Sequence, residues 1–272
     1  MQREFVLPGV LDAYYPTVSE LDYYPFHGIQ RTRQDEWHKK WEAIAQSKQE
    51  LRERGESLIS LLGIAPLPTE YGDYTYMVFG DKTTGEHHEV LIYGQDIGDG
   101  ENILTRVHSA CRTNEVFHAT NCECRKELEE TFKQIQQERK GIIIYLEQEG
   151  RGTGIAGKMK QLEGMFEWRD GKIEQRLTPD GQRVDTDMAY KQAGYQSECR
   201  DFSVAGEMLQ FIGARSVRLV TNNPVKIRAI EEAGISVVPQ EIHIHPDNEI
   251  IKSDLRSKAA NLGHNIAEED LL

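Results

Sequence analysis

Apolar and polar residues alternate along the middle of the chain with the period of two that β-strands show. Four short runs rich in β-branched and aromatic side chains predict strands, at residues 74–79, 89–93, 103–108 and 141–146. The first two runs flank residues 83–86 (Thr-Thr-Gly-Glu), whose composition predicts a hairpin connection. The fourth run is continuously apolar, which is typical of a strand buried on both faces.

Beyond these strands the pattern alternates between helix and strand. Apolar positions recur at helical spacing in three segments, at residues 124–139, 203–212 and 224–233, and Pro224 suits the first turn of the last one. A further strand is predicted at residues 217–220. This alternation predicts a layered α/β (α+β) fold, with a mixed sheet and flanking helices.

Residues 1–65 differ from the rest and are predicted to form an N-terminal extension to a main domain at residues 66–272. Aromatic and proline residues come first, and a helical run follows from about residue 32 to residue 55, with an apolar stripe through Trp37, Trp41 and Ile44. The stripe is compatible with a partner-binding helix. We favour an arm that packs on the main domain or on a second copy, because nothing in the segment carries chemistry.

The composition restricts the classes of protein to consider. The chain has 272 residues, 38% hydrophobic content and a net charge of −13 at pH 7. These values are typical of a globular protein that binds neither nucleic acid nor an anionic membrane. No apolar run approaches the length of a membrane span, and the first residues lack the pattern of a signal peptide. We therefore expect a cytoplasmic protein that holds any anionic ligand in a local basic pocket.

Three cysteines, Cys111, Cys122 and Cys124, form a C-x10-C-x-C array. Three thiolates are what a catalytic zinc requires, because the fourth tetrahedral position must stay open for water, whereas a structural site would close it with another Cys or His. Ordinary buried cysteines are the alternative. Clustering of three of the four cysteines makes a metal the preferred interpretation.

Several segments have the features of a phosphate-binding site. Residues 221–226 (Thr-Asn-Asn-Pro-Val-Lys) follow a predicted strand and open a predicted helix, where backbone N–H groups and the helix dipole favour an anion. Arg106, His108 and Ser109 precede the first cysteine and add charge and hydrogen-bonding groups. A glycine-rich loop is predicted at residues 147–154. Together with three thiols, these features predict a nucleotide whose base lies near zinc and whose phosphates lie elsewhere.

Five short motifs resemble GTP cyclohydrolase II, the entry enzyme of riboflavin synthesis, in the same order and with similar spacing. The motifs lie at residues 106–111, 121–124, 148–151, 199–202 and 219–224. The resemblance extends from about residue 67 to residue 264 and does not cover the first 65 residues. It implies the fold of that family, GTP as the substrate with Mg²⁺ bridging its phosphates, and a homodimer, for which the N-terminal extension is a candidate interface element.

The resemblance also implies a reaction in which the imidazole ring of GTP opens at C8 and pyrophosphate is released. Cys111, Cys122 and Cys124 would hold Zn²⁺, whose bound water has a lowered pKa. Arg200 matches an arginine proposed to attack the α-phosphate. Glu198 stands where the family has an aspartate that assists this arginine. The alternative for Arg200 is a simple salt bridge at the start of a helix.

Further positions match the nucleotide-binding residues of the family. They are Arg106, His108, Ser109, Glu149, Gly150, Arg151, Thr186, Thr221 and Lys226. The resemblance implies triphosphate contacts for Thr221, Lys226 and the segment from Arg106 to Ser109. For His108, a hydrogen-bonded structural histidine is an equally good interpretation.

The chain departs from the family pattern at positions that handle the base. The catalytic tyrosine of the family aligns with Leu162, which cannot donate a hydrogen bond, so the reaction is expected to be able to stop before formate is lost. A glutamine becomes Glu127, and a glutamate associated with reading the guanine edge becomes Met188. An insertion at residues 163–184 is predicted to form a hairpin around Asp170 at the mouth of the site.

Other interpretations stay open. The altered positions are compatible with a related zinc hydrolase that acts on another nucleotide, in pyrimidine degradation or specialised metabolism. A nucleotide-binding regulator without chemistry is a third possibility, against which the three cysteines and Arg200 count. A shifted alignment would let Tyr190 or Tyr195 replace the missing tyrosine. Cys199 is a conceivable fourth zinc ligand, but we do not expect it to be one.

Overall fold

The computed structural model describes the backbone of residues 21–23, 30–32 and 34–271 and the side chains of residues 39–270. The chain divides into two compact units, Met1–Glu50 and Leu51–Leu272. Among the described residues, no helix is long and apolar enough to cross a membrane.

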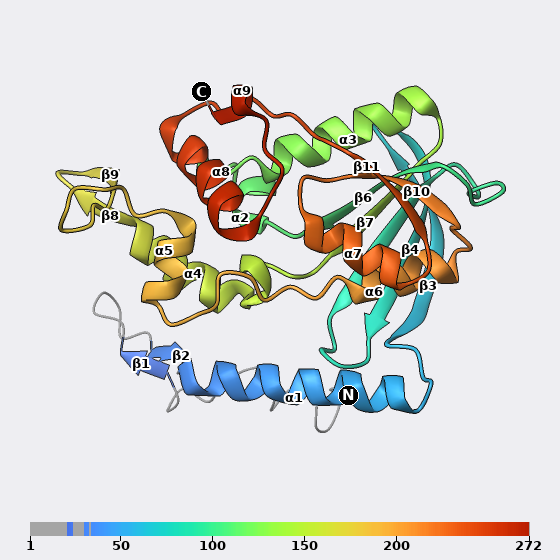
Figure 1. Ribbon diagram of the computed structural model, residues 1–272, viewed down its shortest axis with the longest axis horizontal. Coiled ribbons are helices and arrows are strands. Elements are labelled where there is room, and N and C mark those ends of the chain that lie inside the picture. The colour runs from blue at the N-terminus through green and yellow to red at the C-terminus, as the bar shows by residue number, and fades with distance from the viewer. Residues whose placement is uncertain (1–20, 24–29, 33, 272) are drawn as a thin grey trace, which may run out of the picture. The chain divides into compact units, whose positions relative to one another are not determined.

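The first unit contains a short antiparallel pair of strands and most of one long helix. The strands are β1 (Leu21–Tyr23) and β2 (Gln30–Thr32), and the helix is α1 (Gln34–Glu53) (Figure 1). The helix predicted in this region is therefore confirmed. The side chain of Trp37, which begins the predicted apolar stripe, lies outside the described residues.

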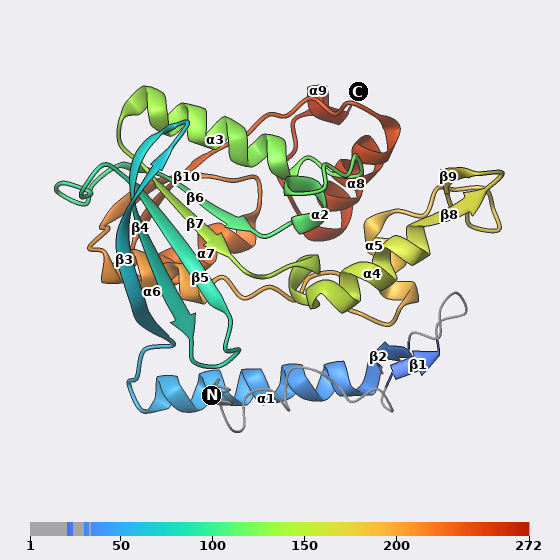
Figure 2. The same ribbon diagram turned by 180° about the vertical axis from the view of Figure 1, so that it is seen from behind.

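The second unit is built around a mixed sheet (Figures 1 and 2). Its described strands are, in spatial order, β11 (Ser236–Gln240), β10 (Ser216–Val220), β6 (Ile103–Ser109), β7 (Ile142–Leu146), β5 (His87–Tyr93), β4 (Gly72–Asp81) and β3 (Ile59–Thr69). The strands from β11 to β7 are parallel, and those from β7 to β3 pair in antiparallel fashion. The mixed sheet predicted from the sequence is confirmed.

Helices cover both faces of this sheet. α3 (Cys124–Glu138) lies on one face, and α6 (Ser203–Phe211) and α7 (Pro224–Glu232) lie on the other (Figures 1 and 2). The remaining helices gather beyond the carboxyl ends of the parallel strands: α2 (Arg112–Glu115), α4 (Gly154–Met165), α5 (Thr186–Gln192), α8 (Glu249–Leu262) and α9 (Glu268–Leu271). This arrangement leaves the site region enclosed by α4, α5 and α8.

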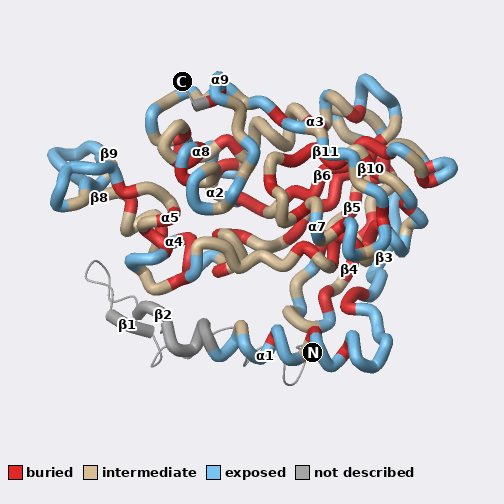
Figure 3. Tube along the Cα trace, in the orientation of Figure 1, coloured by how far each residue is buried: buried red, intermediate tan, exposed pale blue. Residues whose placement is uncertain are grey.

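The burial of β7 explains its continuous apolar sequence. Ile142 and Ile144 point into the apolar cluster that includes α6 and α7, whereas Ile143 points into the cluster beneath α3. All three side chains are completely buried, as the tube in Figure 3 shows for the centre of the sheet. Since both faces of the sheet are covered by helices, neither face of this strand requires polar residues.

The insertion forms the predicted hairpin. β8 (Phe166–Arg169) pairs with β9 (Lys172–Gln175) through a two-residue turn. Asp170 and Gly171 both have positive φ, 49° and 76°, as a tight hairpin turn of this kind requires. The hairpin continues directly from α4, and the chain returns from it into α5.

The sequence pattern did not predict β3, at the edge of the sheet. Leu61, Leu62 and Ile64 are exposed, so the strand lacks the alternation that marks a half-buried segment. The boundary expected between residues 65 and 66 falls inside β3, which pairs with β4 from Ile59 to Thr69. Residues 59–65 therefore belong structurally to the sheet.

Candidate functional site

The candidate site lies where three neighbouring parallel strands end. β6 leads to Cys111, β7 leads to the glycine-rich loop, and β10 leads to Thr221. Because parallel strands present their carboxyl ends at one edge of a sheet, these segments meet around one cavity. Most residues predicted for the site line it: Arg106, His108, Ser109, Cys111, Cys122, Cys124, Glu127, Glu149, Gly150, Arg151, Thr186, Arg200, Thr221 and Lys226.

Two of the positions expected to handle the base do not line this cavity. Leu162 lies on α4, and Met188 packs instead against the apolar cluster that contains Met165. No residue of the insertion at 163–184 lines the cavity. Of the two tyrosines considered as replacements for the missing one, Tyr190 lines the cavity and Tyr195 does not.

Glu198 and Cys199 also lie outside the cavity lining. Glu198 contacts Arg200, as described below, whereas the sulfur of Cys199 lies 3.8 Å from the carbonyl oxygen of Gln196. Among the described residues, the group of possible metal ligands contains Cys111 and its two partners but not Cys199.

The three thiols form one compact cluster. Cys111 follows β6, Cys122 lies just before α3, and Cys124 is the first residue of α3. Their sulfur atoms all lie within 4.8 Å of one another, and those of Cys111 and Cys122 are 3.6 Å apart. A tetrahedral zinc with Zn–S bonds of about 2.3 Å would separate its sulfurs by roughly 3.8 Å. The cluster therefore has the dimensions of a zinc site, and the described residues leave a fourth position open.

The hydrogen bonds within the cluster shift the pKa values of the thiols in opposite directions. Contacts from Cys122 and Cys124 lower the pKa of Cys111 to about 3. The contact from Cys111 raises the pKa of Cys124 to about 12, with burial acting in the same direction. One thiolate is thus already favoured, and a metal ion would take over the role of the shared protons.

A carboxylate fixes the position of the first cysteine. One oxygen of Glu115 accepts hydrogen bonds from the backbone N–H of Cys111 (2.9 Å) and from Nε2 of His108 (2.8 Å). The other oxygen accepts a hydrogen bond from the hydroxyl of Tyr145 (2.6 Å). His108 is almost fully buried, and burial lowers its pKa below the usual range, so it is a neutral ring that donates from Nε2. The interpretation of His108 as a structural histidine is supported by these contacts.

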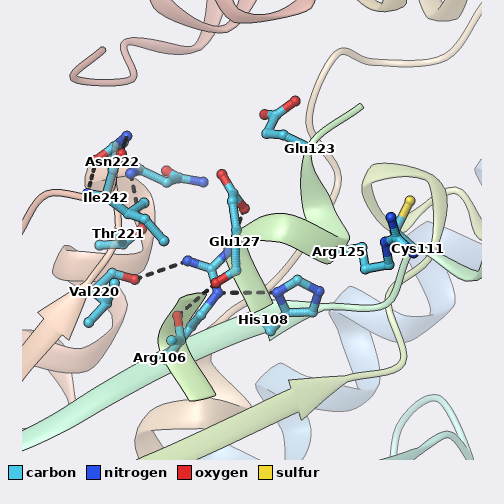
Figure 4. A network of polar contacts seen from close by, with 12 residues as sticks. Arg106, His108, Cys111, Glu123, Arg125, Glu127, Val220, Thr221, Asn222 and Ile242 are labelled. Atoms are coloured by element: carbon cyan, nitrogen blue, oxygen red, sulfur yellow. Dashed lines mark hydrogen bonds and ion pairs between the residues drawn. The ribbon is translucent and has the colours of Figure 1, made fainter. Parts of the chain in front are cut away.

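Arg106 is the centre of the polar network in Figure 4. Its Nε donates to Nδ1 of His108 (3.2 Å), and its Nη1 donates to the carbonyl oxygen of Val220 (3.4 Å). Its Nη2 forms an ion pair with Glu127. Burial would raise the pKa of Glu127, but the attraction of Arg106 and then of Lys258 outweighs it and lowers the pKa to about 2. Glu127 is therefore a carboxylate inside the basic end of the cavity.

Lys226 supplies a second buried cation at this end. Its Nζ donates to the carbonyl oxygen of Val107 (2.7 Å) and lies 5.3 Å from the centre of the Phe202 ring. Burial, followed by the charges of Arg200 and Arg106, holds the pKa of Lys226 well below its usual value. A bound anion would compensate these cations and favour the charged ammonium.

Arg200 and Glu198 form a two-point ion pair. Nε of Arg200 donates to Oε1 of Glu198 (2.8 Å), the backbone N–H of Arg200 donates to the same oxygen (3.0 Å), and Nη2 contacts Oε2. Burial would lower the pKa of Arg200, but Glu198 outweighs burial and raises it. The guanidinium is thus a positioned cation with a proton acceptor in contact.

The glycine-rich loop forms another part of the cavity wall. Glu149 accepts hydrogen bonds from the backbone N–H groups of Arg112 (2.7 Å) and Gly150 (3.0 Å). Arg151 adopts a positive φ of 55° and donates to the carbonyl oxygen of Ser197 (3.2 Å) and to Asp254 (3.4 Å). These contacts tie the loop after β7 to α2, to the segment before Arg200 and to α8.

Two of the predicted hydroxyl-bearing residues on the cavity lining, Ser109 and Thr221, differ in their hydrogen bonds. The Oγ of Ser109 is buried and has no hydrogen-bond partner among the described residues. The Oγ1 of Thr221 accepts from the backbone N–H of Asn223 (3.1 Å), which stabilises the turn that opens α7. Ser109 is therefore the hydroxyl more directly available to a ligand.

The structure adds lining residues that sequence reasoning missed. They are, among others, Glu123, Lys158, Asp254, Lys258 and His264. Asp254 and Lys258 face one another at i, i+4 on α8 (2.9 Å), and Lys258 also pairs with Glu123. The spacing of Asp254 and Lys258 was the one available sequence signal, but such pairs are common on exposed helices.

Comparison with known proteins identifies related chains. A protein-family model described as GTP cyclohydrolase II matches residues 62–241. The riboflavin biosynthesis protein RibBA of Parabacteroides distasonis is 38% identical over 218 residues, which are 79% of this chain and 50% of that protein. The GTP cyclohydrolase-2 of Neisseria meningitidis is 37% identical over 212 residues, which are 78% of this chain and 98% of that protein.

The extent of these matches differs between relatives. The chain spans about half the length of the RibBA proteins that it matches. Among solved structures, a two-domain 3,4-dihydroxy-2-butanone 4-phosphate synthase from A. baumannii aligns with 80% of this chain and 51% of that chain, at 12% identity and a TM-score of 0.36. That likeness is too low to carry an argument about the site.

Proposed function

Because the chain belongs to the GTP cyclohydrolase II family, we propose that it is a hydrolase that opens the imidazole ring of GTP at C8 and releases pyrophosphate. The observation that carries the proposal is the shared cavity of two chemically different groups. The three-thiol cluster and the cations Arg106, Arg200 and Lys226 line the same cavity. A purine ring and a polyphosphate chain are the two halves of a ligand that such a cavity suits.

The cationic end is proposed to bind the triphosphate. Arg106 and Lys226 are both buried, with 3% and 8% exposure, and burying such cations is costly without an anion. Glu127 compensates only one of them directly. A triphosphate would supply the missing negative charge, with the Ser109 hydroxyl as an additional donor. We propose Mg²⁺ as the companion of the triphosphate, on the basis of the family resemblance.

The thiol cluster is proposed to hold Zn²⁺ through Cys111, Cys122 and Cys124. The sulfur separations fit the ion, and three thiolates leave room for a water or substrate atom. Zinc in such a site supplies Lewis acidity and lowers the pKa of a water molecule. Glu115 contributes by holding the backbone of Cys111, and it keeps His108 in the tautomer that accepts from Arg106. The metal end and the phosphate end are thus joined by hydrogen bonds.

Arg200 is proposed to attack the α-phosphate. In this step an Nη atom forms a bond to the α-phosphorus, the bond from that phosphorus to the bridging oxygen breaks, and pyrophosphate leaves with the bonding electrons. Glu198 is the acceptor of the guanidinium proton, because its carboxylate already contacts Nε and Nη2. Water subsequently cleaves the phosphorus–nitrogen bond and restores the arginine.

The fate of the formyl group is proposed to depend on Tyr190. Leu162 does not line the cavity, whereas Tyr190 does, and its ring lies 5.8 Å from the guanidinium carbon of Arg151. If the Tyr190 hydroxyl does not serve the second hydrolysis, the ring-opened product keeps its formyl group, as the position of Leu162 led us to expect.

A related hydrolase for a different nucleotide is the second candidate function. Met188 packs in an apolar cluster, so the residue expected to read the guanine edge is absent from the cavity lining. Glu127 adds a carboxylate at the phosphate end, and its negative charge would weaken the binding of a highly charged anionic ligand. Both observations favour a base or a phosphate chain that differs from those of GTP.

The test is mass spectrometry of the products formed by zinc-loaded protein from GTP and Mg²⁺, with formate and pyrophosphate assayed alongside. A formylated, ring-opened product with pyrophosphate would support the proposal with formyl retention. A deformylated product with formate would support the complete cyclohydrolase reaction. Turnover of another nucleoside triphosphate in place of GTP would favour the second candidate. Tight GTP binding without turnover would favour a nucleotide-binding protein.

Lys226→Met is the variant that tests the phosphate end, and Lys133→Met is its matched control. Lys226 lies in the cavity, whereas Lys133 lies on α3 and does not line it. The proposal requires the first substitution to abolish GTP turnover and the second to leave it unchanged. A cytoplasmic homodimer, with residues 1–65 as a candidate interface element, stays a prediction.

A further inference from the structure

The chain reversal after α8 brings His264 to the cavity. Gly263 ends the helix in a left-handed conformation with φ +67°, and the backbone N–H of His264 donates to the carbonyl oxygen of Lys258 (3.3 Å). The next residue, Asn265, donates its backbone N–H to the carbonyl oxygen of Asn222 (2.9 Å). His264 is therefore held beside the turn that follows β10.

The imidazole of His264 lacks a counterpart. It lines the cavity, and its Nε2 is buried without a hydrogen-bond partner among the described residues. Buried polar atoms in folded proteins are almost always paired with protein, ordered water or ligand. An unpaired ring nitrogen on a cavity wall points to a group that arrives with the ligand.

The charges around His264 indicate the sign of that group. Lys258 on α8, Arg200 before α6 and Lys226 on α7 repel a proton on the ring, and Glu127 on α3 attracts one. Burial, followed by these three cations, lowers the pKa of His264 to about 3. The ring is thus neutral, and the repulsion from these cations outweighs the attraction of Glu127. An anion would reverse this balance.

We propose that His264 binds the polyphosphate chain of the ligand and takes up a proton when that chain enters the cavity. The inference rests on the proposed function, because it assumes that the cations around Lys226 receive phosphate. It assigns His264, which no motif marks as a ligand, a binding role and a coupling role. A protonated imidazole can donate from both ring nitrogens, so the orphaned Nε2 gains a phosphate oxygen as its acceptor.

Proton uptake makes the affinity for phosphate depend on pH in a defined direction. The pKa of His264 is low in the free protein and higher in the complex with phosphate. At pH values between these two, each unit rise in pH weakens phosphate binding up to tenfold, because His264 must take up one proton when the anion binds. A residue that stays neutral removes this dependence. A residue with a permanent positive charge keeps the affinity and also removes the dependence.

The test is isothermal titration calorimetry with inorganic pyrophosphate and zinc-loaded protein, at fixed Mg²⁺ between pH 6.5 and 8.5. Buffers of different ionisation enthalpy report the number of protons taken up. The unmodified protein should take up about one proton more than His264→Gln at the same pH, so that the protonation of pyrophosphate itself cancels. His264→Gln should bind pyrophosphate about tenfold more weakly at pH 6.5, with a smaller difference at pH 8.5.

Two further variants make the result specific. His264→Lys should bind as tightly as the unmodified protein at pH 6.5 without the excess proton uptake. His245→Gln, at a side chain that is 81% exposed, should match the unmodified protein throughout. Equal affinity and equal proton uptake in the unmodified protein and His264→Gln would overturn the inference but leave the proposed function standing. Failure of pyrophosphate to bind the unmodified protein would overturn the phosphate end of the cavity and the inference together.

Discussion

Gly152 packs directly against the backbone of Cys199. A Cβ atom on Gly152 would lie 2.8 Å from the carbonyl carbon of Cys199 and 2.9 Å from the backbone nitrogen of Arg200. The backbone N–H of Cys199 also donates to the carbonyl oxygen of Arg151 (3.0 Å). The glycine-rich loop therefore sets the position of Arg200, although no side chain takes part in the contact.

This contact predicts that Gly152→Ala reduces catalysis by displacing Arg200. We expect kcat to fall at least tenfold, because a shift of a few tenths of an ångström separates the guanidinium from its target. Gly154→Ala is the matched control, since Gly154 also has a positive φ (+73°) but nothing lies within 4 Å of an added Cβ. Steady-state kinetics on both variants, with thermal unfolding to show that both fold, measures the difference. An equal fall in kcat in the two variants would show that backbone strain alone, and not the contact with Cys199, causes the effect.

Removal of a cluster thiol is predicted to abolish metal binding. Cys111→Ser, Cys122→Ser and Cys124→Ser should each reduce the zinc content of purified protein from about one ion per chain to near zero, because a hydroxyl is a poor ligand for zinc. Cys199→Ser should keep the full content, since its sulfur is not part of the cluster. Elemental analysis after dialysis gives the stoichiometry. Loss of zinc in Cys199→Ser would restore that residue as a ligand.

The ion pair of Glu127 with Arg106 is predicted to make stability depend on acid pH. The pKa of Glu127 is about 2 in the folded protein and 4.5 as its ordinary value. Because the folded value is the lower one, the pair stabilises the fold above about pH 4.5 and loses this contribution as the pH falls through 2. Glu127→Gln should therefore be less stable than the unmodified protein by about 1–3 kcal/mol at pH 7.

This difference should shrink as the pH falls from 5 towards 2. Urea unfolding at a series of pH values measures it, with Glu249→Gln as a control whose side chain is 61% exposed. A stability difference between Glu127→Gln and the unmodified protein that does not change with pH would show that the carboxylate gains nothing from its charged neighbours.

The sequence was most informative where the reactive residues of the site are also close together along the chain. Residues 106–124 contain a strand, a basic segment and the cysteines, so spacing alone brought Arg106 and Cys111 into one site. α3 and β7 were predicted because their apolar residues face a core. β3 was missed because its side chains are largely exposed. Lys158 and His264 were missed because Lys158 reaches the cavity from α4 and His264 from the chain reversal after α8, and a single lysine or histidine carries no spacing signal.

The position of Tyr190 predicts the outcome of two substitutions on the product. Tyr190→Phe removes the hydroxyl of a residue that lines the cavity, so any formate release by the unmodified protein should fall at least tenfold while pyrophosphate release persists. Leu162→Tyr should not restore formate release, because position 162 does not line the cavity. Formate and pyrophosphate assays on the same reactions separate the two hydrolyses. Recovery of formate release in Leu162→Tyr would show that α4 reorients when substrate binds.

The cavity is assembled from parts of the chain that are synthesised far apart in time. The thiol cluster spans only residues 111–124, so a growing chain possesses all three sulfurs before β7 and β10, two of the three strands that lead to the cavity, have been made. The cationic end is complete only after Lys226 has been synthesised, and Lys258 and His264, which also line the cavity, are added later still. If the cluster holds zinc as proposed, a nascent chain can bind the metal before the rest of the cavity has been made, and zinc supply during translation would then affect how many chains mature.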